Sequence, residues 1–341
     1  MKKTTTKREI RIGIVGAGLI GAKRAESIKT TGKGKLIAIA DVDHARAKVL
    51  AEKYGVESAG EWKKFVTRKD IDAIVVAVPN AFAMPIVLAA LKHKKHVFCE
   101  KPFGITVKQS ATMLAAAKKA RKVVKVGFNH RFHVGILKAY EIFKVGGIGK
   151  VFFIRARYGH GGRKGMEKEW RFNKKISGGG ELLDQGVHII DLARLFGGEF
   201  TRVYGDMQTK FWKTKLDDNI FVLMNNDRTT VSFHVSTTNW RNIFSFEVFG
   251  ELGFLEIQGK GGGYGEEILT YGKRNLGFAP TLEVFKFGLE DTSWDREWEN
   301  FIDAVRGKAK LVGSPDDGLQ ANRLIEAIYR SARTHKEIRL T

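Results

Sequence analysis

The feature that most constrains the fold is a glycine pattern at the end of the first apolar segment. Residues 10–15 are apolar and lead into a G-x-G-x-x-G pattern, and a helical pattern over residues 19–30 follows. In such a strand–turn–helix unit the glycines permit a tight turn, admit a pyrophosphate to the backbone and let helix and strand pack closely. The helix N-terminus also presents free N–H groups to phosphates. The residues that we expect to meet a dinucleotide here are Gly16, Gly18, Leu19, Ile20 and Gly21.

An acidic residue ends the next predicted strand. Residues 36–40 are apolar, and Asp41 follows them at the spacing from the glycines where an acid meets the adenosine ribose. A carboxylate at this position favours NAD, because it repels the additional phosphate of NADP. The nearby cationic side chains of His44, Arg46 and Lys48 leave NADP open as an alternative.

Strand-like and helical patterns continue to alternate as far as residue 128. We therefore expect an α/β Rossmann domain over residues 1–128, with a doubly wound parallel sheet. Ligands bind at the carboxyl ends of the strands in such a sheet. The residues at these ends, which we expect to border the cofactor, are Val78, Pro79, Asn80, Glu100, Lys101, Asn129 and Arg131. Pro102 restricts the backbone of Lys101 and permits a cis peptide bond that would direct the lysine.

The pattern changes after residue 128 to longer strands with few helical crossovers. Strands are predicted over residues 151–158 and 200–212, and residues 219–236 read as a hairpin. We expect an α+β substrate-binding domain over residues 129–341, with a large, open and mainly antiparallel sheet. One face should carry helices, and the other should mediate formation of a homodimer or homotetramer.

The end of the chain contains a strong helix-start signal. Ser314 has the position of an N-cap, Pro315 the first helical position and Asp317 the third. A helix is therefore predicted over about residues 315–333, and it could pack back on the first domain.

A second glycine-rich segment, residues 178–180, precedes a helical pattern that carries Asp184 and His188. Residues four apart share one face of an α-helix, so this pair could move a proton on and off a bound hydroxyl. The alternative is an exposed carboxylate and a buried, hydrogen-bonded histidine on an ordinary helix. Asp191 follows on roughly the same face, but no further strong ligand is evident nearby, and we expect no metal site.

The formal net charge of +22 is unusual, yet the lysines are spread over nearly every predicted helix. This distribution favours a solvated surface that attracts an anionic small molecule over a specific nucleic-acid partner. Residues 1–9 are polar, and the longest apolar run is broken by Pro79 and Pro85, so we expect no membrane span. Cys99 is the single cysteine, which fits a cytoplasmic location.

These motifs together resemble the Gfo/Idh/MocA family, named for glucose–fructose oxidoreductase and inositol dehydrogenase. The matching segments are residues 16–21, Asp41, residues 100–102, 127–131 and 178–191. The resemblance implies NAD(P)-dependent oxidation or reduction of a sugar, cyclitol or sugar nucleotide. It places the family's catalytic lysine, aspartate and histidine on Lys101, Asp184 and His188. The segment over residues 160–171 resembles members that act on sugars or nucleotide sugars.

In the mechanism that we expect, His188 is the general acid/base and Lys101 donates to the same substrate oxygen. Which of the two takes the proton stays open at this point. The predicted substrate-binding residues are Lys101, Arg157, Tyr158, His160, Arg171, Asp184 and His188. Their cations could bind an acidic group on the sugar. Two other functions fit the motifs: NAD-assisted glycoside hydrolysis, and non-catalytic dinucleotide binding.

Overall fold

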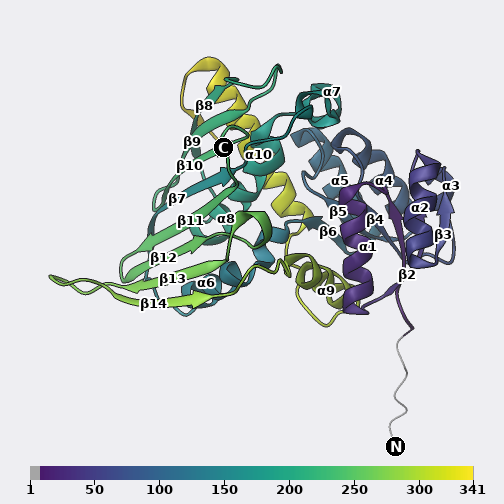
Figure 1. Cartoon of the computed structure of the whole chain (residues 1–341), viewed down its shortest axis with the longest axis horizontal. Coiled ribbons are helices and arrows are strands. Elements are labelled where there is room, and N and C mark those ends of the chain that lie inside the picture. The colour runs from purple at the N-terminus through teal and green to yellow at the C-terminus, as the bar shows by residue number, and fades with distance from the viewer. Residues whose placement is uncertain (1–7, 341) are drawn as a thin grey trace, which may run out of the picture.

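The computed structural model describes residues 8–340, and two sheets dominate it (Figure 1). The first sheet is parallel and six-stranded, in the order β3-β2-β1-β4-β5-β6. Its strands are β1 (Arg11–Val15), β2 (Lys35–Ala40), β3 (Glu57–Ala59), β4 (Ala73–Val76), β5 (His96–Glu100) and β6 (Val124–Gly127). Its helices are α1 (Leu19–Thr31), α2 (His44–Tyr54), α3 (Trp62–Phe65), α4 (Ala83–Lys92) and α5 (Val107–Ala120). This order confirms the predicted doubly wound Rossmann domain.

Local sequence signals set several of the helix ends in this domain. Asp43 caps α2 by accepting a hydrogen bond from the backbone of Arg46, and the helix ends at Gly55 in the left-handed conformation. Thr106 caps α5 in the same way. The short elements β3 and α3 were not predicted, because three or four residues carry too little periodicity to identify.

The second sheet has nine strands in the order β14-β13-β12-β11-β7-β10-β9-β8-β15, and only the β7–β10 pair is parallel. Its strands are β7 (Val151–Gly159), β8 (Arg202–Gln208), β9 (Asn219–Asn225), β10 (Thr230–Ser236), β11 (Ile243–Gly250), β12 (Gly253–Gln258), β13 (Ile268–Lys273), β14 (Thr281–Lys286) and β15 (Ile338–Arg339). The open, mainly antiparallel sheet is confirmed. The strand predicted over residues 200–212 ends early, because the backbone N–H groups of residues 210–212 donate to the Asp218 carboxylate.

In the described part of the chain, residues 8–340, the helices cover one face of the large sheet. They include α6 (Val134–Lys144), α8 (Val187–Gly197) and α10 (Pro315–Thr334), and α8 and α10 lie between the sheet and the Rossmann domain (Figure 1). Ser314 and Asp317 form the predicted capping box at the start of α10.

Two late helices also complete the Rossmann domain. Helix α10 contacts α5 and β6, and Asn322 donates hydrogen bonds to the backbone oxygens of Phe103 and Gly104 at 3.0 and 2.9 Å. Helix α9 (Ser293–Val305) packs on α1, where Trp298 and Phe301 are fully buried. Both core clusters of the first sheet are therefore filled partly by residues from the end of the chain.

The other face of the large sheet is bare and partly apolar. Its exposed large hydrophobic side chains include Phe153, Tyr204, Phe221, Leu223, Leu282 and Val284. The face contains a hollow of about 540 Å³ lined by residues of five strands, among them Arg155, Phe221 and His234. We refer to this surface as the outer face.

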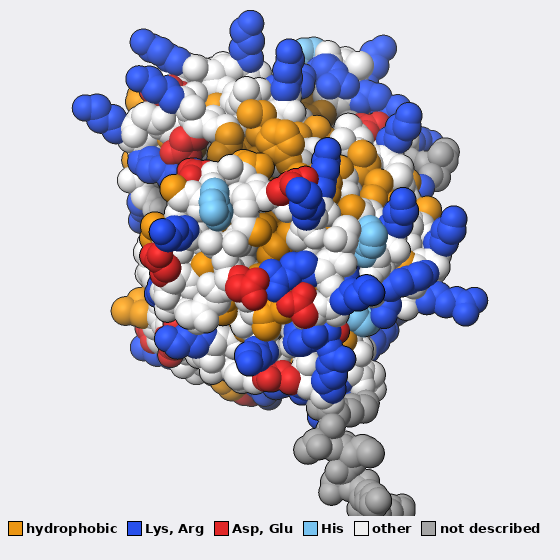
Figure 2. Space-filling view, turned by 90° about the vertical axis from the view of Figure 1, so that its right-hand side faces the viewer, with side chains coloured by type: hydrophobic (Ala, Val, Ile, Leu, Met, Phe, Trp, Pro, Cys, Tyr) orange, Lys and Arg blue, Asp and Glu red, His pale blue; other side chains and the backbone are white. Residues whose placement is uncertain are grey.

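The positive charge is dispersed over the surface. On the side that Figure 2 presents, Lys and Arg side chains are scattered, with Asp and Glu side chains among them. Within residues 8–340, no helix is long and apolar enough to cross a membrane.

Candidate active site

The glycine loop between β1 and α1 is shaped for close approach of a ligand to the backbone. Gly16 has a φ of +107°, and a Cβ there would lie 2.2 Å from the backbone oxygen of Ala77. A Cβ on Gly21 would lie 1.8 Å from the oxygen of Gly16. Gly18, in contrast, faces open space, and no side chain caps α1. The first and third glycines are thus required for packing, and the second leaves room for a diphosphate.

Asp41 ties the end of β2 to this loop. Its carboxylate accepts hydrogen bonds from the backbone N–H groups of Ala17 at 2.7 Å and Asp43 at 2.9 Å. The side chain is only partly buried, so its remaining lone pairs can accept from ribose hydroxyls. The loop and the acid therefore fit NAD, with open backbone for the diphosphate and an acceptor for the adenosine ribose.

The predicted cofactor residues at the ends of β4 and β6 differ in their surroundings. Val78 and Pro79 are partly buried, and Val78 lies beside Gly16. Asn80, at the start of the 3-10 turn η1 (Asn80–Phe82), donates to the backbone oxygen of Ser177 at 2.8 Å and so joins the two domains. Asn129 is buried and donates to the hydroxyl of Ser293 at 3.0 Å. The amides of both asparagines are therefore engaged within the protein.

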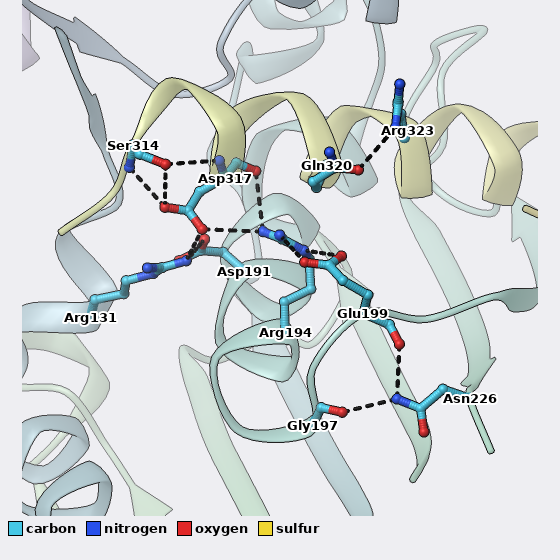
Figure 3. Close-up of polar contacts among 10 residues, drawn as sticks. All are labelled: Arg131, Asp191, Arg194, Gly197, Glu199, Asn226, Ser314, Asp317, Gln320 and Arg323. Atoms are coloured by element: carbon cyan, nitrogen blue, oxygen red, sulfur yellow. Dashed lines mark hydrogen bonds and ion pairs between the residues drawn. The ribbon is translucent and has the colours of Figure 1, made fainter. Parts of the chain in front are cut away.

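Arg131 lies in an internal ion-pair network (Figure 3). From the turn η2 (Asn129–Phe132), its guanidinium donates to both carboxylate oxygens of Asp191 at 2.6 Å and to Asp317 at 3.1 Å. Arg131 and Asp191 are 8% and 1% exposed. The structure therefore does not place Arg131 in the cofactor crevice. It also directs Asp191 away from Asp184, against the predicted shared helix face.

Lys101, at the carboxyl end of β5, reaches across to the second domain. Its peptide bond to Pro102 is cis, as the sequence permits. The ammonium donates to a carboxylate oxygen of Asp184 at 2.7 Å and to the backbone oxygen of the same residue at 2.5 Å. Arg171 approaches the other carboxylate oxygen at 3.4 Å. Burial opposes ionisation of this carboxyl, but Lys101 and Arg171 outweigh it and hold its pKa below the usual value.

The turn that carries Asp184 is not the ordinary α-helix that the spacing predicts. Residues Leu182–Gly186 form a π-helical turn, η5, and α8 begins only at Val187. Asp217 supports this entry, because its carboxylate accepts from the N–H groups of Gly180 at 3.1 Å and Leu182 at 2.8 Å. A π turn holds an additional residue and rotates the residues that follow it. Asp191 consequently points to Arg131.

His188 is buried and stacks on a second histidine. Its ring lies 3.9 Å from that of His130, with 16° between the planes. Within residues 8–340, its Nδ1 is buried without a hydrogen-bond partner, which leaves Nε2 to meet a ligand. Burial, with the charges of Lys101 and Lys260, lowers the pKa of His188 well below its ordinary value. The imidazole is therefore neutral at neutral pH and able to accept a proton.

Several residues of this site were missed by the sequence analysis. Two of them, His130 and Tyr264, pack against the ring of the predicted residue Tyr158. Their ring centroids lie 5.1 and 5.6 Å from that of Tyr158. Lys260 lies over the ring of Tyr264. Glu181 is buried, and burial beside Asp184 raises the pKa of its carboxyl well above the usual value. His130 and Glu181 lie inside the motif segments 127–131 and 178–191, but the sequence analysis assigned them no role of their own. No motif marks Lys260 or Tyr264, because only the fold brings the end of β12 and the turn η6 to this site.

The remaining predicted substrate residues divide into two groups. His160 accepts from the N–H of Gly162 at 2.9 Å and lies close enough to Asp184 for that charge to act on its pKa, and Arg171 contacts Asp184 directly. Arg157 instead alternates with Tyr158 on β7 and lines the hollow of the outer face. The structure therefore brings His160 and Arg171 to the site and places Arg157 on the opposite face of the sheet.

Within the described part of the chain, no cluster of three or more His, Cys, Asp or Glu side chains could hold a metal ion.

Comparison with known proteins agrees with this architecture. Residues 10–128 match a domain model described as an oxidoreductase family with an NAD-binding Rossmann fold, and residues 136–256 match a GFO/IDH/MocA C-terminal domain. The chain belongs to the Gfo/Idh/MocA oxidoreductase family. It is therefore an NAD-dependent oxidoreductase, which confirms the resemblance and the cofactor inferred from the sequence.

Characterised relatives in this family extend over the whole chain. D-glucoside 3-dehydrogenase of Escherichia coli K12 is 28% identical and covers 100% of both chains. Myo-inositol 2-dehydrogenase of Thermotoga maritima is 27% identical over 97% of this chain and 98% of its own. A levoglucosan dehydrogenase, solved in complex with NADH and L-sorbose, superposes with a TM-score of 0.89 at 22% identity, covering 98% of this chain and 99% of its own. This last likeness is one of fold.

Proposed function

We propose that this enzyme transfers a hydride between NAD and a secondary hydroxyl carbon of a sugar, cyclitol or sugar nucleotide. The relatives named above act on a glucoside and on an inositol, which supports this class of substrate. When bound, NAD supplies the hydride acceptor, and the protein orients the substrate and moves the proton.

The observation that carries the proposal is the pairing of Lys101 with Asp184 beside the neutral imidazole of His188. Lys101 extends from the Rossmann domain, and the other two residues come from η5 and α8 of the second domain. Lys101 lies close enough to His188 to lower its pKa. A hydroxyl between these side chains would therefore meet a charged donor and a neutral acceptor.

We assign the proton to His188 in the direction of oxidation. Its neutral imidazole accepts the hydroxyl proton, and the ammonium of Lys101 donates to the same oxygen and stabilises developing alkoxide charge. Asp184 holds Lys101 in position, since its carboxylate accepts a hydrogen bond of 2.7 Å from the lysine Nζ. In the direction of reduction the same groups return the proton.

Replacement of His188 tests this assignment. His188→Ala should lower turnover on the order of 10²–10⁴-fold, as loss of a general base does, while NADH still binds. Turnover is measured as NADH formation from a panel of sugars and cyclitols, and NADH affinity by fluorescence titration. His93→Ala, an exposed histidine at the end of α4, is the matched control and should remain fully active.

The same assay separates the proposal from its alternatives. Net accumulation of NADH from a free sugar indicates a dehydrogenase, whereas NAD-assisted glycoside hydrolysis would release a sugar without it. Near-normal turnover of His188→Ala would contradict the role of the imidazole.

A further inference from the structure

A second lysine lies in the site from the side of the large sheet. Lys260 follows β12 after Gly259, which has a φ of +67°, and the 3-10 turn η6 (Gly262–Tyr264) comes next and brings the ring of Tyr264 against its ammonium. Its Nζ lies 4.0 Å from the ring centroid of Tyr264 and 5.6 Å from that of Tyr158. Tyr158 in turn contacts the stacked histidines His130 and His188. The ammonium therefore lies in the wall of the catalytic site.

Among residues 8–340, no carboxylate forms an ion pair with this ammonium. Within residues 8–340, the side chain of Lys260 makes no hydrogen bond and no ion pair, whereas Lys101, Arg171 and Arg163 are each paired with a carboxylate. Lys101 and Arg171 share Asp184, and Arg163 contacts Glu169. The charge of Lys260 is thus offset only from a distance, by the carboxylates of Asp291 and Glu267.

The acids closest to Lys260 are already engaged elsewhere. Asp291 accepts from the N–H and hydroxyl of Ser293 and from the indole of Trp294. Glu267 accepts from the N–H of Gly135 at 2.7 Å. Neither carboxylate therefore forms an ion pair with Lys260.

The local environment makes an unpaired charge unfavourable. Lys260 is partly buried, and burial, together with Lys23 and Lys101, lowers the pKa of its amine to about 8. The two tyrosine rings stabilise the cation through their π faces, but they supply no negative charge. An anion that entered the site would find a charged donor already positioned and only partly hydrated.

We propose that Lys260 anchors an acidic group on the substrate, a carboxylate or a phosphate, and thereby selects acidic sugars over neutral ones. The inference rests on the proposed function, because it identifies the substrate class of the same site. Lysine suits such a group as a compact charge with rotatable donors. The tyrosine hydroxyls add neutral hydrogen-bonding capacity around it.

Binding measurements test the proposal without requiring turnover. Matched sets of a hexose, its hexuronate and its 6-phosphate, in the gluco and galacto series, are titrated calorimetrically into the NADH-bound enzyme. At least one acidic member should bind about tenfold or more tightly than its neutral counterpart, the gain expected from a hydrogen bond to a charged group. Comparing the hexuronate with the phosphate distinguishes the two sources of negative charge.

Three variants assign the effect to the side chain. Lys260→Met should abolish the preference for the acidic ligand, leave the affinity for the neutral hexose unchanged, and leave NADH affinity unchanged. Lys260→Arg should restore part of the preference. Lys286→Met, which removes an exposed charge from β14, should behave as the unmodified enzyme.

Three results would overturn the proposal. They are equal or weaker binding of every acidic ligand, a preference that survives Lys260→Met, and a loss of NADH affinity in that variant, which would assign the ammonium to the cofactor. Failure of the proposed function looks different. In that case the unmodified enzyme would bind acidic sugars through Lys260 but form no NADH from them.

Discussion

Asp184 accepts a hydrogen bond from Lys101, and the proposed mechanism uses this contact to assign the proton to His188. Lys101 is engaged by Asp184, and burial lowers the pKa of His188, so we propose the neutral imidazole as the acceptor. The motifs singled out Lys101, Asp184 and His188 as candidates, and the family resemblance assigned them catalytic roles that stay a prediction. They could not decide between lysine and histidine, because that choice depends on burial and on neighbouring charges from other elements.

The pH dependence of oxidation should reflect this arrangement. Protonation of His188 removes the acceptor, and its pKa lies well below 6.5, so turnover should stay level from pH 8 to pH 6.5 and fall only in more acidic solution. The measurement is the initial rate of NADH formation at saturating NAD and sugar across this range. A fall in turnover centred at or above pH 6.5 would contradict a buried, neutral His188. The residual activity of His188→Ala should not show the fall in acidic solution.

At the level of elements, the sequence predicted where helices begin more reliably than how they turn. Ser314 caps α10 as expected, and Thr106 caps α5 in the same way, because capping depends on residues close in sequence. The π turn at residues 182–186 was not predictable, since Asp217, which holds its entry, comes from a distant loop. That turn also explains why Asp191 meets Arg131.

Removal of Arg131 should therefore affect stability and not cofactor binding. Arg131→Met leaves the buried Asp191 without its partner, which should cost about 3–5 kcal/mol of unfolding free energy. Urea denaturation gives this value, and fluorescence titration of the folded variant gives NADH affinity. The double variant Arg131→Met/Asp191→Leu should recover part of the loss, because no unpaired charge remains. Unchanged stability with weakened NADH binding would instead return Arg131 to the cofactor site.

For the whole molecule, the alternation of strands and helices predicted the two sheets and their helices. It did not predict the strands at the edges of the large sheet. β13, β14 and β15 lie at or near the sheet edges, and their sequences lack the sustained alternation that marks central strands. The position of Lys260 was not predictable either. Lys260 follows β12, and its place in the site depends on the pairing of β12 with β11, which the sequence does not reveal.

The bare outer face should bring copies of the chain together, as a dimer or a tetramer. Its exposed apolar side chains include Phe221 and Leu223, which are 49% and 45% exposed on β9. Phe221→Glu/Leu223→Glu should shift the sedimentation coefficient to that of a monomer at micromolar concentration. Val145→Glu, at an 85% exposed position after α6, is the control and should not change it. A monomer before any substitution would disprove self-association through this face.

Helices α9 and α10 close the packing of a domain whose first strand, β1, lies about 280 residues earlier in the chain. Until Trp298, Phe301 and Asn322 have been synthesised, the nascent Rossmann sheet lacks part of its cover on both sides. Vectorial folding during translation, in which an N-terminal domain matures before the next one emerges, is therefore incomplete for this protein. The cofactor cradle reaches its final form only when the last helices have left the ribosome.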